Sequence, residues 1–597
     1  MLTAALWLLV FHVNATTRFV TTTGTGSGTS WVDASSDLQG MINTSSPGDE
    51  VWVATGTYKP TAYPTGCSGC NSTRDYTFFV KDGVSIYGGF AGTETDISQR
   101  NITANPTTLS GDFNDDDVVT GSGSSLSITG NGENAYHVVV SSAPSSGGIG
   151  VTIDGFIITG GNADIVYLIT INGNNLSRRE GGGIYINNGE NLLMNNNVLN
   201  NSASFGGGIY CNNSTNTLES NSVLNNFGGD GGGINLDLGI NTLINNTISG
   251  NVSNDGGGIK TYFGSFFMSE NILSDNYSYN QGGGILNLYS TCLVLKNILS
   301  GNWAYNSGGG IYLGGGDNKL SNNILHNNSA RYGGAICFLH SSLNTITNNT
   351  ISGNSAENGG GIYNASGKGV IRNNIFYGNQ KEGSSTIAGA DYYVYSVNDN
   401  TFKNNALQLI DTNYPLDQST NYGIGTLATG NIFAQDPLFL NYLDPIGPDN
   451  IWYTTDDGLR LQNNSPAVNA GTLSGAPITD ITDAFRVGNP DIGAYEYIPD
   501  SLIIFSLDTI NNLLTAYPNS FTQSTTIAFT LLETTEAVLN IYGIDGREVA
   551  QIFKGIVEAG KLYSVEFNGA GLSSGIYIVS LTGATGVQQR YRLVLTD

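Results

Sequence analysis

The sequence predicts an all-β protein whose main part is a parallel β-helix, a solenoid in which short strands stack coil upon coil. Three observations predict this fold: a glycine phrase that recurs every 25 or 26 residues, aliphatic columns in register with it, and two columns of asparagine. A repeat of this length is typical of solenoids, whose units bury their apolar side chains by stacking on their neighbours.

The glycine phrase is Gly-Gly-Gly-Ile, with one Gly-Gly-Ala-Ile variant. Its copies begin at Gly181, Gly206, Gly231, Gly256, Gly282, Gly308, Gly333 and Gly359. The asparagine columns are Asn196, Asn221, Asn246, Asn271, Asn297, Asn323, Asn349 and Asn374, and then Asn201, Asn226, Asn251, Asn276, Asn302, Asn328, Asn354 and Asn379. Three aliphatic columns begin at Ile184, Leu193 and Val198.

A helical repeat does not explain these columns, because glycine, asparagine, serine and threonine are poor helix formers. The apolar residues come in short β-branched runs, which favour strands. Three aliphatic columns predict three strands per coil, each pointing one set of side chains inward. Asparagine suits the corners, because it tolerates left-handed backbone angles and its stacked amides bond along the axis.

Length and charge limit the classes of protein to consider. A chain of 597 residues predicts several domains. With 48 acidic against 22 basic residues the net charge is -26, which argues against nucleic acid and anionic lipid as partners. No run after the N-terminus approaches the roughly 20 apolar residues of a membrane span, so we expect no transmembrane helix.

The chain divides into six predicted parts. Residues 1–15 form a short apolar run that ends in Val13-Asn14-Ala15, which predicts a secretory signal peptide; an N-terminal strand of the solenoid is the alternative. Residues 16–150 are the cap and first coils, which protect the strand edges of the solenoid's end. Regular coils at 151–380, an irregular end at 381–498 and a linker at 499–513 follow. Residues 514–597 form the C-terminal domain.

The C-terminal domain has a different pattern. About seven alternating segments fill residues 514–597, and a turn at Gly543-Ile544-Asp545-Gly546 separates two of them as in a β-hairpin. This number of strands predicts a small immunoglobulin-like sandwich.

A family resemblance rests on phrases after the repeats. Trp452-Tyr453-Thr454, Ser465-Pro466-Ala467 and Asp491-Ile492-Gly493 follow the β-helix in an order that resembles the choice-of-anchor Q group of bacterial surface proteins. The glycine phrases also resemble the repeats of polymorphic outer-membrane proteins. This resemblance covers roughly residues 18–497. It implies a right-handed β-helix at the cell surface, in a group without a uniform activity.

A second resemblance lies in the C-terminal domain. Its phrases resemble the type A C-terminal sorting domain of the type IX secretion system at Tyr517, Pro518, Asn519, Gly546, Arg547, Gly575, Ile576 and Tyr577. The chain departs from that family at Ser520, where a second proline is usual, and in its arginine-containing tail. The resemblance implies the type IX machinery as a partner, passage across the outer membrane, and a secreted or surface-attached product.

Parallel β-helices often carry polysaccharide lyases and hydrolases, so charged residues of the coils are also candidates for catalysis. A lyase needs carboxylates for calcium and a base that removes a proton from the sugar. Asp230 and Asp255 share one column, and direct stacking brings them within about 5 Å of each other. Lys260 lies five residues further on. These three residues are the candidate catalytic cluster; solvated loop charge is the alternative.

Calcium is the one cofactor that the sequence suggests. Asp112, Asn114 and Asp116 alternate oxygen-bearing side chains as calcium loops do, without the glycine and final glutamate of an EF-hand. Asp449 with Asp456 and Asp457 is a similar pattern. Ordinary turn chemistry is the alternative for both loops.

Tyr185, Tyr210, Tyr312 and Tyr363 stand next to the first isoleucine column and are expected to point outward. Tyrosine rings on a flat face can stack on sugars, although ladder packing within the sheet explains them equally well. Cys67 and Cys70 lie close enough in sequence to form a disulfide in an oxidising compartment.

The leading hypothesis is a secreted or cell-surface protein that acts as an adhesin or glycan-binding rod without catalysis. The alternative is a calcium-dependent polysaccharide lyase or another carbohydrate-active enzyme built on the β-helix. A groove in which carboxylates and a basic residue converge favours the enzyme, whereas an exposed aromatic face favours the binding rod.

Overall fold

The computed structural model describes two compact units, residues 1–497 and 498–597. The described residues are 15–145, 147–339, 343–385, 390–395, 400–407, 430–486, 488–498 and 514–596, the last range without 518, 520, 522, 530, 532–533, 544–546, 559–560, 562 and 584–585. The predicted signal peptide lies outside these residues, apart from its last position. Within the described ranges, no helix is long and apolar enough to cross a membrane.

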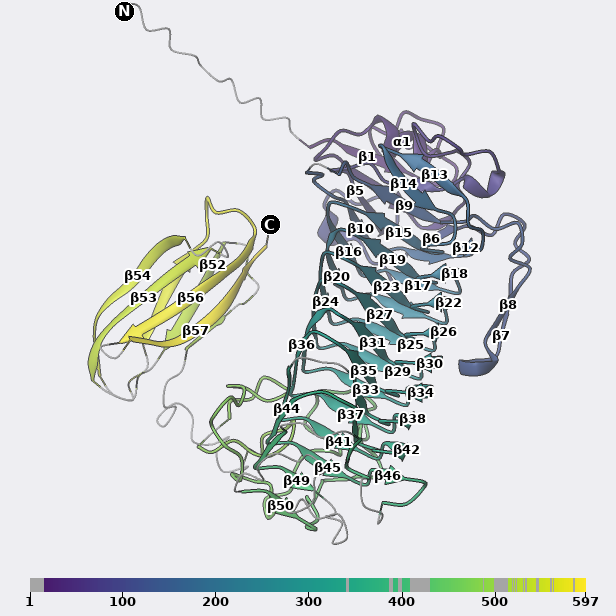
Figure 1. Cartoon of the computed structure of the whole chain (residues 1–597). Helices are drawn as coiled ribbons and strands as arrows, with labels where there is room; N and C mark the ends of the chain where they lie inside the picture. The colour runs from purple at the N-terminus through teal and green to yellow at the C-terminus, as the bar shows by residue number, and fades with distance from the viewer. Residues whose placement is uncertain are drawn as a thin grey trace, which may run out of the picture. The chain divides into compact units, whose positions relative to one another are not determined.

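Each regular coil contains four short strands rather than the predicted three. In one coil these are β15 (Ile184–Asn187), β16 (Glu190–Met194), β17 (Asn197–Leu199) and β18 (Ser202–Phe205). Strands at the same position in successive coils pair in parallel, so the stack forms four sheets (Figure 1). The extra strand is the fourth one, which carries no aliphatic column.

The first two sheets have 13 strands each. Sheet 1 contains β16 and β1 (Thr17–Val20), β2 (Glu50–Ala54), β5 (Ser85–Phe90), β10 (Thr152–Asp154), β20 (Thr215–Glu219), β24 (Ile240–Ile244), β28 (Ser265–Ser269), β32 (Thr291–Leu295), β36 (Asp317–Ser321), β40 (Leu343–Thr347), β44 (Gly369–Arg372) and β48 (Thr401–Lys403). Sheet 2 contains β17 and β3 (Gly56–Tyr58), β6 (Thr107–Ser110), β11 (Ile157–Thr159), β21 (Ser222–Leu224), β25 (Thr247–Ser249), β29 (Ile272–Ser274), β33 (Ile298–Ser300), β37 (Ile324–His326), β41 (Thr350–Ser352), β45 (Ile375–Tyr377), β49 (Ala406–Leu407) and β50 (Ile432–Phe433).

The other two sheets are shorter. Sheet 3 contains β18 and β12 (Asn162–Ala163), β22 (Phe227–Asp230), β26 (Val252–Asp255), β30 (Tyr277–Gln281), β34 (Trp303–Ser307), β38 (Ser329–Tyr332), β42 (Ser355–Asn358) and β46 (Gln380–Lys381). Sheet 4 contains β15 and β4 (Phe78–Phe79), β9 (Val139–Ser142), β19 (Ile209–Asn212), β23 (Ile234–Asp237), β27 (Ile259–Tyr262), β31 (Ile285–Leu288), β35 (Ile311–Gly314), β39 (Ile336–Phe338), β43 (Ile362–Asn364) and β47 (Tyr392–Val394).

Four corner residues with left-handed backbone explain the four strands. In the coil that begins at residue 181 they are Gly181 (φ 66°), Asn188 (63°), Asn195 (51°) and Asn200 (57°). Glycine and asparagine are the residues that adopt this conformation most readily. The expectation that the ladder asparagines themselves are left-handed is wrong, because the left-handed residue stands immediately before each of them.

The ladder asparagines instead satisfy buried backbone groups. Asn196 donates its side-chain amide to Asn221 Oδ1 (3.1 Å), which also accepts the Asn196 backbone N–H (3.0 Å). The Nδ2 of Asn221 donates in turn to the Leu193 carbonyl (2.8 Å). All of these groups are buried, so each coil depends on the next for its polar groups as well as for its core.

The aliphatic columns meet inside the four sheets as predicted. Ile184, Leu193 and Val198 are fully buried, and the same core cluster continues from coil to coil. The second glycine of each phrase is needed because the coils approach closely: a Cβ on Gly207 would lie 2.4 Å from the Phe227 carbonyl oxygen.

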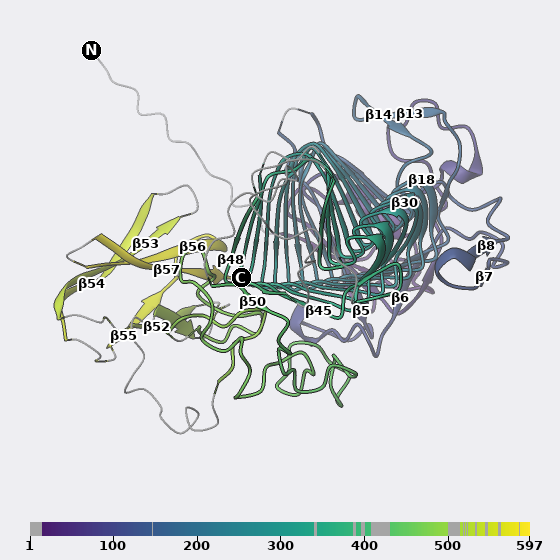
Figure 2. The same ribbon diagram turned by 60° about the horizontal axis from the view of Figure 1, so that its bottom comes forward.

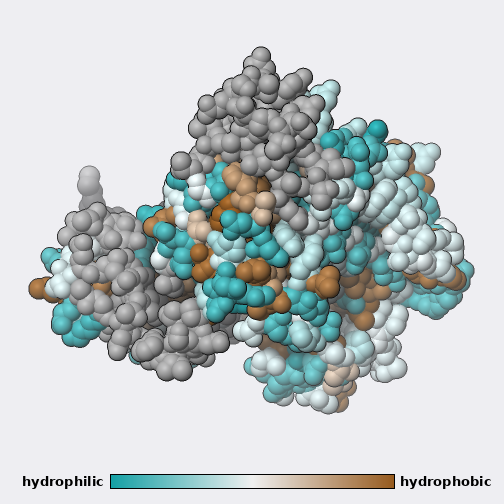
Figure 3. Space-filling model, turned by 90° about the horizontal axis from the view of Figure 1, so that it is seen from below, coloured by the Kyte–Doolittle hydropathy of each residue, from teal (hydrophilic) through white to brown (hydrophobic). Residues whose placement is uncertain are grey.

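The first coils and one side of the solenoid are covered. The helix α1 (Leu38–Thr44) is capped by Asp37 and buries Leu38 and Ile42 in the first coils. After the last coils, residues 434–497 return along the outer face of sheet 2, where Tyr495 belongs to one apolar cluster with Ile298 and Ile324. Seen from this end, small apolar groups alternate with hydrophilic ones (Figure 3). The 3-10 helices η1 (Thr73–Asp75) and η2 (Ile97–Gln99) lie in the N-terminal part.

Two hairpins project from the coils, β7 (Val118–Thr120) with β8 (Ser127–Thr129), and β13 (Leu168–Ile171) with β14 (Asn174–Ser177). The 3-10 helix η3 (Gly123–Ser125) forms the tip of the first hairpin. Figure 2 shows both hairpins outside the stacked coils, on the side of sheet 3. Cys67 and Cys70 form the disulfide that their spacing allows.

The described residues of the C-terminal unit include seven antiparallel strands. One sheet contains β51 (Leu514–Tyr517), β52 (Ser524–Phe529) and β55 (Tyr563–Asn568); the other contains β54 (Glu548–Val557), β53 (Thr535–Gly543), β56 (Gly575–Gly583) and β57 (Gly586–Leu595). Buried side chains from both sheets, among them Phe529 and Leu539, form one core.

We predict that Asn246→Ala lowers the free energy of unfolding by about 3 kcal/mol, because it leaves buried donors on Asn221 and a buried carbonyl on Leu218 without partners. Denaturant unfolding of the full chain measures this change. Asn225→Gly is the matched control. It replaces a left-handed corner residue (φ 52°) with the residue found at the equivalent corners Gly250 and Gly301, and its effect should stay within about 0.5 kcal/mol. Equal losses in both variants would contradict this role of the ladder.

We also predict that acid destabilises the solenoid through His326. Burial lowers the pKa of His326 to about 4, below the value of about 6.5 in an unfolded chain. The neutral ring therefore contributes its full stability above pH 6.5, and this contribution is lost as the pH falls toward 4. The loss amounts to about 3 kcal/mol. Unfolding midpoints measured between pH 7 and pH 4 should depend less on pH in His326→Gln; an unchanged slope would exclude this residue as a cause.

Candidate functional site

The three charged residues predicted as a catalytic cluster lie together. The parallel register of β22 and β26 pairs Asp230 with Asp255, and the Lys260 side chain from β27 forms an ion pair with Asp230. Asp255 accepts hydrogen bonds from Asn280 Nδ2 (2.9 Å) and from the Gln281 backbone (3.3 Å). The described structure thus brings the cluster to the junction of sheets 3 and 4. Its catalytic role stays a prediction.

Burial dominates the electrostatics of this cluster. Burial raises the pKa of Asp255. The negative charge of Asp230 raises this pKa further, whereas the positive charge of Lys260 lowers it. Asp237, on the neighbouring strand β23, also has a pKa raised by burial, and it accepts a hydrogen bond from the Tyr210 hydroxyl (2.8 Å). Asn235 stands between Tyr210 and Lys260 in the same column and is only 1% exposed, without a partner for its amide.

The predicted tyrosine face is largely covered. Tyr185, Tyr210 and Tyr312 are 1%, 5% and 4% exposed, so the expectation that their rings form an open surface is wrong. The β13–β14 hairpin packs over Tyr185 and Tyr210 through apolar side chains such as Ile169. Tyr363 is half-buried and stacks on the ring of Tyr393, with the ring centroids 5.5 Å apart.

An aromatic patch that the sequence reasoning missed lies on sheet 3. Tyr277 and Trp303 stand next to each other on β30 and β34, with ring centroids 4.3 Å apart and nearly parallel planes. Tyr279 and Tyr305 lie beside them and are 43% and 66% exposed. We call these four residues the aromatic patch. A signal was present in the sequence, since Tyr277 and Trp303 each follow a ladder asparagine directly.

The aromatic patch coincides with the irregular part of the repeat. The strands β30 and β34 have five residues each, whereas β26 and β38 have four. The register of sheet 3 shifts at these strands, as it does at a β-bulge. Bulges are frequent next to functional sites because they redirect side chains without disturbing the neighbouring sheets.

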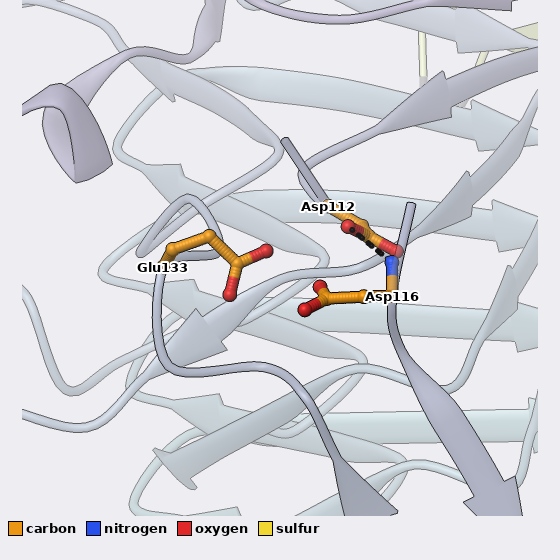
Figure 4. Close-up of side chains that lie close together, drawn as sticks. All are labelled: Asp112, Asp116 and Glu133. Carbon is orange, nitrogen blue, oxygen red and sulfur yellow. Dashed lines mark hydrogen bonds between the residues drawn. The ribbon is translucent and has the colours of Figure 1, made fainter. Parts of the chain in front are cut away.

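Acidic side chains converge at the base of the first hairpin. One carboxylate oxygen from each of Asp112, Asp116 and Glu133 lies within 4.8 Å of the others, and Figure 4 shows the three groups turned toward one another. The predicted ligand Asn114 donates its backbone N–H to Asp112 Oδ1 (3.1 Å), and its role as a ligand stays a prediction. Glu133, from the far side of the hairpin, joins the two predicted aspartates.

Asp117 and Asn134 extend this acidic cluster. Asn134 Nδ2 donates to Asp117 Oδ2 (2.8 Å). Burial raises the pKa of Asp117 to about 6, and the charges of Asp112, Glu133 and Asp116 contribute to the rise.

The second acidic loop, which contains Asp456 and Asp457, has a different environment. Asp457 accepts a hydrogen bond from the Tyr495 hydroxyl (2.6 Å) and so stabilises the segment that covers sheet 2.

The predicted sorting residues mostly hold strand ends together. Asn519 donates to the Arg592 carbonyl (2.9 Å) and accepts from the Val594 N–H (2.8 Å). The Arg547 carbonyl closes the predicted turn by accepting the Gly543 N–H (2.9 Å). Tyr517 lies in β51, and the Tyr577 hydroxyl donates to the Ser573 carbonyl (2.6 Å). Gly575 begins β56, Ile576 is 38% exposed, and Pro518 and Gly546 lie outside the described residues.

Two family matches agree with the two units. Residues 278–436 match the family described as right handed beta helix region, and residues 515–595 match the family described as secretion system C-terminal sorting domain. No curated protein matches the chain. A solved structure described as pectate lyase Pel9A is similar to it, with 15% identity, 81% of this chain and 98% of that chain covered, and a TM-score of 0.37.

These matches define the class of protein: an exported right-handed β-solenoid, with eight copies of the glycine phrase in its regular part, and a C-terminal sorting domain. The sorting domain indicates secretion through the type IX system, to the cell surface or the extracellular space. The chain carries the β-helix and sorting domains that the sequence resemblances implied, whereas the choice-of-anchor Q assignment remains a prediction.

Proposed function

We propose that the exported solenoid is a non-catalytic glycan-binding rod that holds its ligand at the aromatic patch. The observation that carries this proposal is the grouping of four aromatic rings on adjacent strands, with Tyr279 and Tyr305 exposed and Tyr277 and Trp303 half-buried. Aromatic rings present a flat apolar face with a polar tip, which matches the apolar faces and hydroxyl rim of a sugar ring. The C-terminal unit, which we interpret as an immunoglobulin-like sandwich, would engage the type IX secretion machinery.

Polar groups beside the aromatic patch support the same ligand class. Asn280 follows Tyr279 on strand β30, and its side-chain amide donates a hydrogen bond to Asp255. Asp255 stands opposite Asp230 in the strand register, and Asp230 forms an ion pair with Lys260. Carboxylate and amide groups at the edge of aromatic rings give orientation through hydrogen bonds to hydroxyl groups, while the rings contribute the buried area.

The alternative, a polysaccharide lyase, is favoured by the same three charged residues next to an aromatic surface. One contact argues against it. Lys260 is engaged by Asp230, so it would have to leave this ion pair to accept a proton.

We predict that Trp303→Ala weakens glycan binding about 30-fold, since truncating a central aromatic anchor costs about 2 kcal/mol. A glycan array identifies a ligand, and calorimetry with that ligand measures the change. Tyr167→Ala is the matched control: Tyr167 is 72% exposed and lies before β13, away from the aromatic patch, so its removal should leave affinity unchanged.

The same purified proteins test the alternative function, a polysaccharide lyase. Polysaccharides incubated with the protein should yield neither unsaturated products, detected by ultraviolet absorbance, nor new reducing ends. Cleavage that Lys260→Met abolishes would replace the binding rod with a lyase, and absence of both binding and cleavage would contradict a role on glycans.

We further predict that deletion of residues 514–597 retains the protein in the periplasm, because the sorting domain is then missing. Cell fractionation and surface labelling of the native host measure the distribution. Replacing Asn519 with alanine tests the domain's fold within the full chain, since it removes the two bonds to β57. Unchanged surface display of the deletion variant would contradict the assignment.

A further inference from the structure

A hairpin arm connects the acidic cluster to the aromatic patch. The arm comprises residues 118–129, with β7 and β8 as its two strands and η3 at its tip. Residues 112–117 enter it and residues 130–134 leave it, so the acidic cluster lies at its base. At its tip, the Ser124 carbonyl accepts a hydrogen bond from the Tyr279 hydroxyl (3.1 Å), which belongs to the aromatic patch.

We propose that Asp112, Asp116 and Glu133 bind a calcium ion at the base of the hairpin arm, with Asp117 and Asn134 beside them. Converging acidic residues alone would be weak evidence. The independent observation is Asn134, which is 0% exposed, aims its amide at Asp117 in this cluster, and has no partner for its Oδ1. Buried polar atoms without partners are rare in folded proteins, and a bound ion is one way to satisfy them.

Further oxygen atoms at the same place also lack partners. They are Glu133 Oε1 and Asp117 Oδ1, both buried. The basic side chain that approaches this loop, Lys59, forms its ion pair with Asp115 (2.7 Å) instead of with the converging carboxylates. The concentrated negative charge is therefore not neutralised by Lys59, and a cation would neutralise it.

The donor set selects calcium among the common cations. All candidate ligands are carboxylate or amide oxygens, the ligand type of hard cations, and no sulfur or imidazole takes part. Calcium–oxygen distances are about 2.3–2.6 Å, so two ligands on opposite sides of the ion lie about 5 Å apart. The observed limit of 4.8 Å between the oxygens of Asp112, Asp116 and Glu133 fits within that span.

The backbone around Asp112 is arranged as a preformed loop. Its Oδ1 accepts N–H groups from Asn114 (3.1 Å) and Asp115 (2.7 Å), while its Oδ2 accepts the N–H of Asp117 (3.2 Å). Asp115 adopts a left-handed conformation (φ 58°), which turns the chain around the carboxylate. This loop fixes Asp112, and the ion would then draw in Glu133 from the other side of the arm.

The position of the site gives the ion a mechanical role. It would join the residue segments before β7 and after β8, so it closes the base of the arm. A closed base holds the tip near Tyr279, on the strand β30 that carries part of the aromatic patch. The calcium site itself does not depend on the proposed glycan binding, and its test uses no glycan.

The test is calcium titration of the full chain by isothermal calorimetry after treatment with a chelator. We expect one site with a dissociation constant of about 10⁻⁴–10⁻³ M, the range of extracellular calcium modules. The double variant Asp116→Asn with Glu133→Gln should bind at least tenfold more weakly. Asp317→Asn, which changes an exposed carboxylate on β36, should bind as the unchanged chain does. Absence of binding in the unchanged chain, or equal binding by the double variant, overturns the site.

Limited proteolysis with a broadly specific protease tests the consequence for the arm. Calcium should slow cleavage within residues 112–134 several-fold in the unchanged chain and in Asp317→Asn, but not in the double variant. Circular dichroism establishes that the double variant is folded; Glu133→Gln alone replaces it if it is not. Cleavage that calcium leaves unchanged while the ion binds would overturn the role in holding the arm.

Discussion

The structure depends on one constraint: the polar groups of each coil find their partners in the next coil. The asparagine ladders make this plain, because Asn221 accepts from Asn196 on one side and donates to Asn246 on the other. A buried amide in this position is stabilising only if the neighbouring coils carry the same amide at the same position. The corners must therefore recur at fixed intervals, which explains the strict period, and the first coil requires a cover such as α1.

Sheet 3 is the part of the coil that this constraint leaves most free. Its inward row consists of small residues such as Ala203, Ser278 and Ala304, which need little space and accept small shifts of the backbone. An extra residue in β30 and β34 is absorbed there without disturbing the ladders on either side. The outward positions of sheet 3 consequently vary between coils, and this variation is what allows an aromatic patch to form on one part of the rod.

The same physics decides how much could be predicted from the sequence. Aliphatic columns are strong signals, so sheets 1, 2 and 4 were predicted, whereas the small inward residues of sheet 3 give no hydrophobic period. The outward direction of Tyr185 and Tyr210 follows from strand alternation, but the hairpin that buries them, residues 168–177, precedes the first glycine phrase and carries none of the repeat. Glu133 was missed for a similar reason, because the arm between it and Asp116 brings together residues whose spacing carries no motif.

The charge of the protein limits the possible classes of ligand more than its fold does. A net charge of -26 repels polyanions, although salt limits this repulsion to about 8 Å from each exposed charge at physiological ionic strength. Asp255 is next to the strand that carries part of the aromatic patch, since Asn280, which follows Tyr279 on β30, contacts this carboxylate. An acidic polysaccharide would therefore meet repulsion where it stacks on the rings, whereas a neutral glycan would find acceptors for its hydroxyl groups. The electrostatics thus favour neutral glycans over the acidic substrates that lyases cleave.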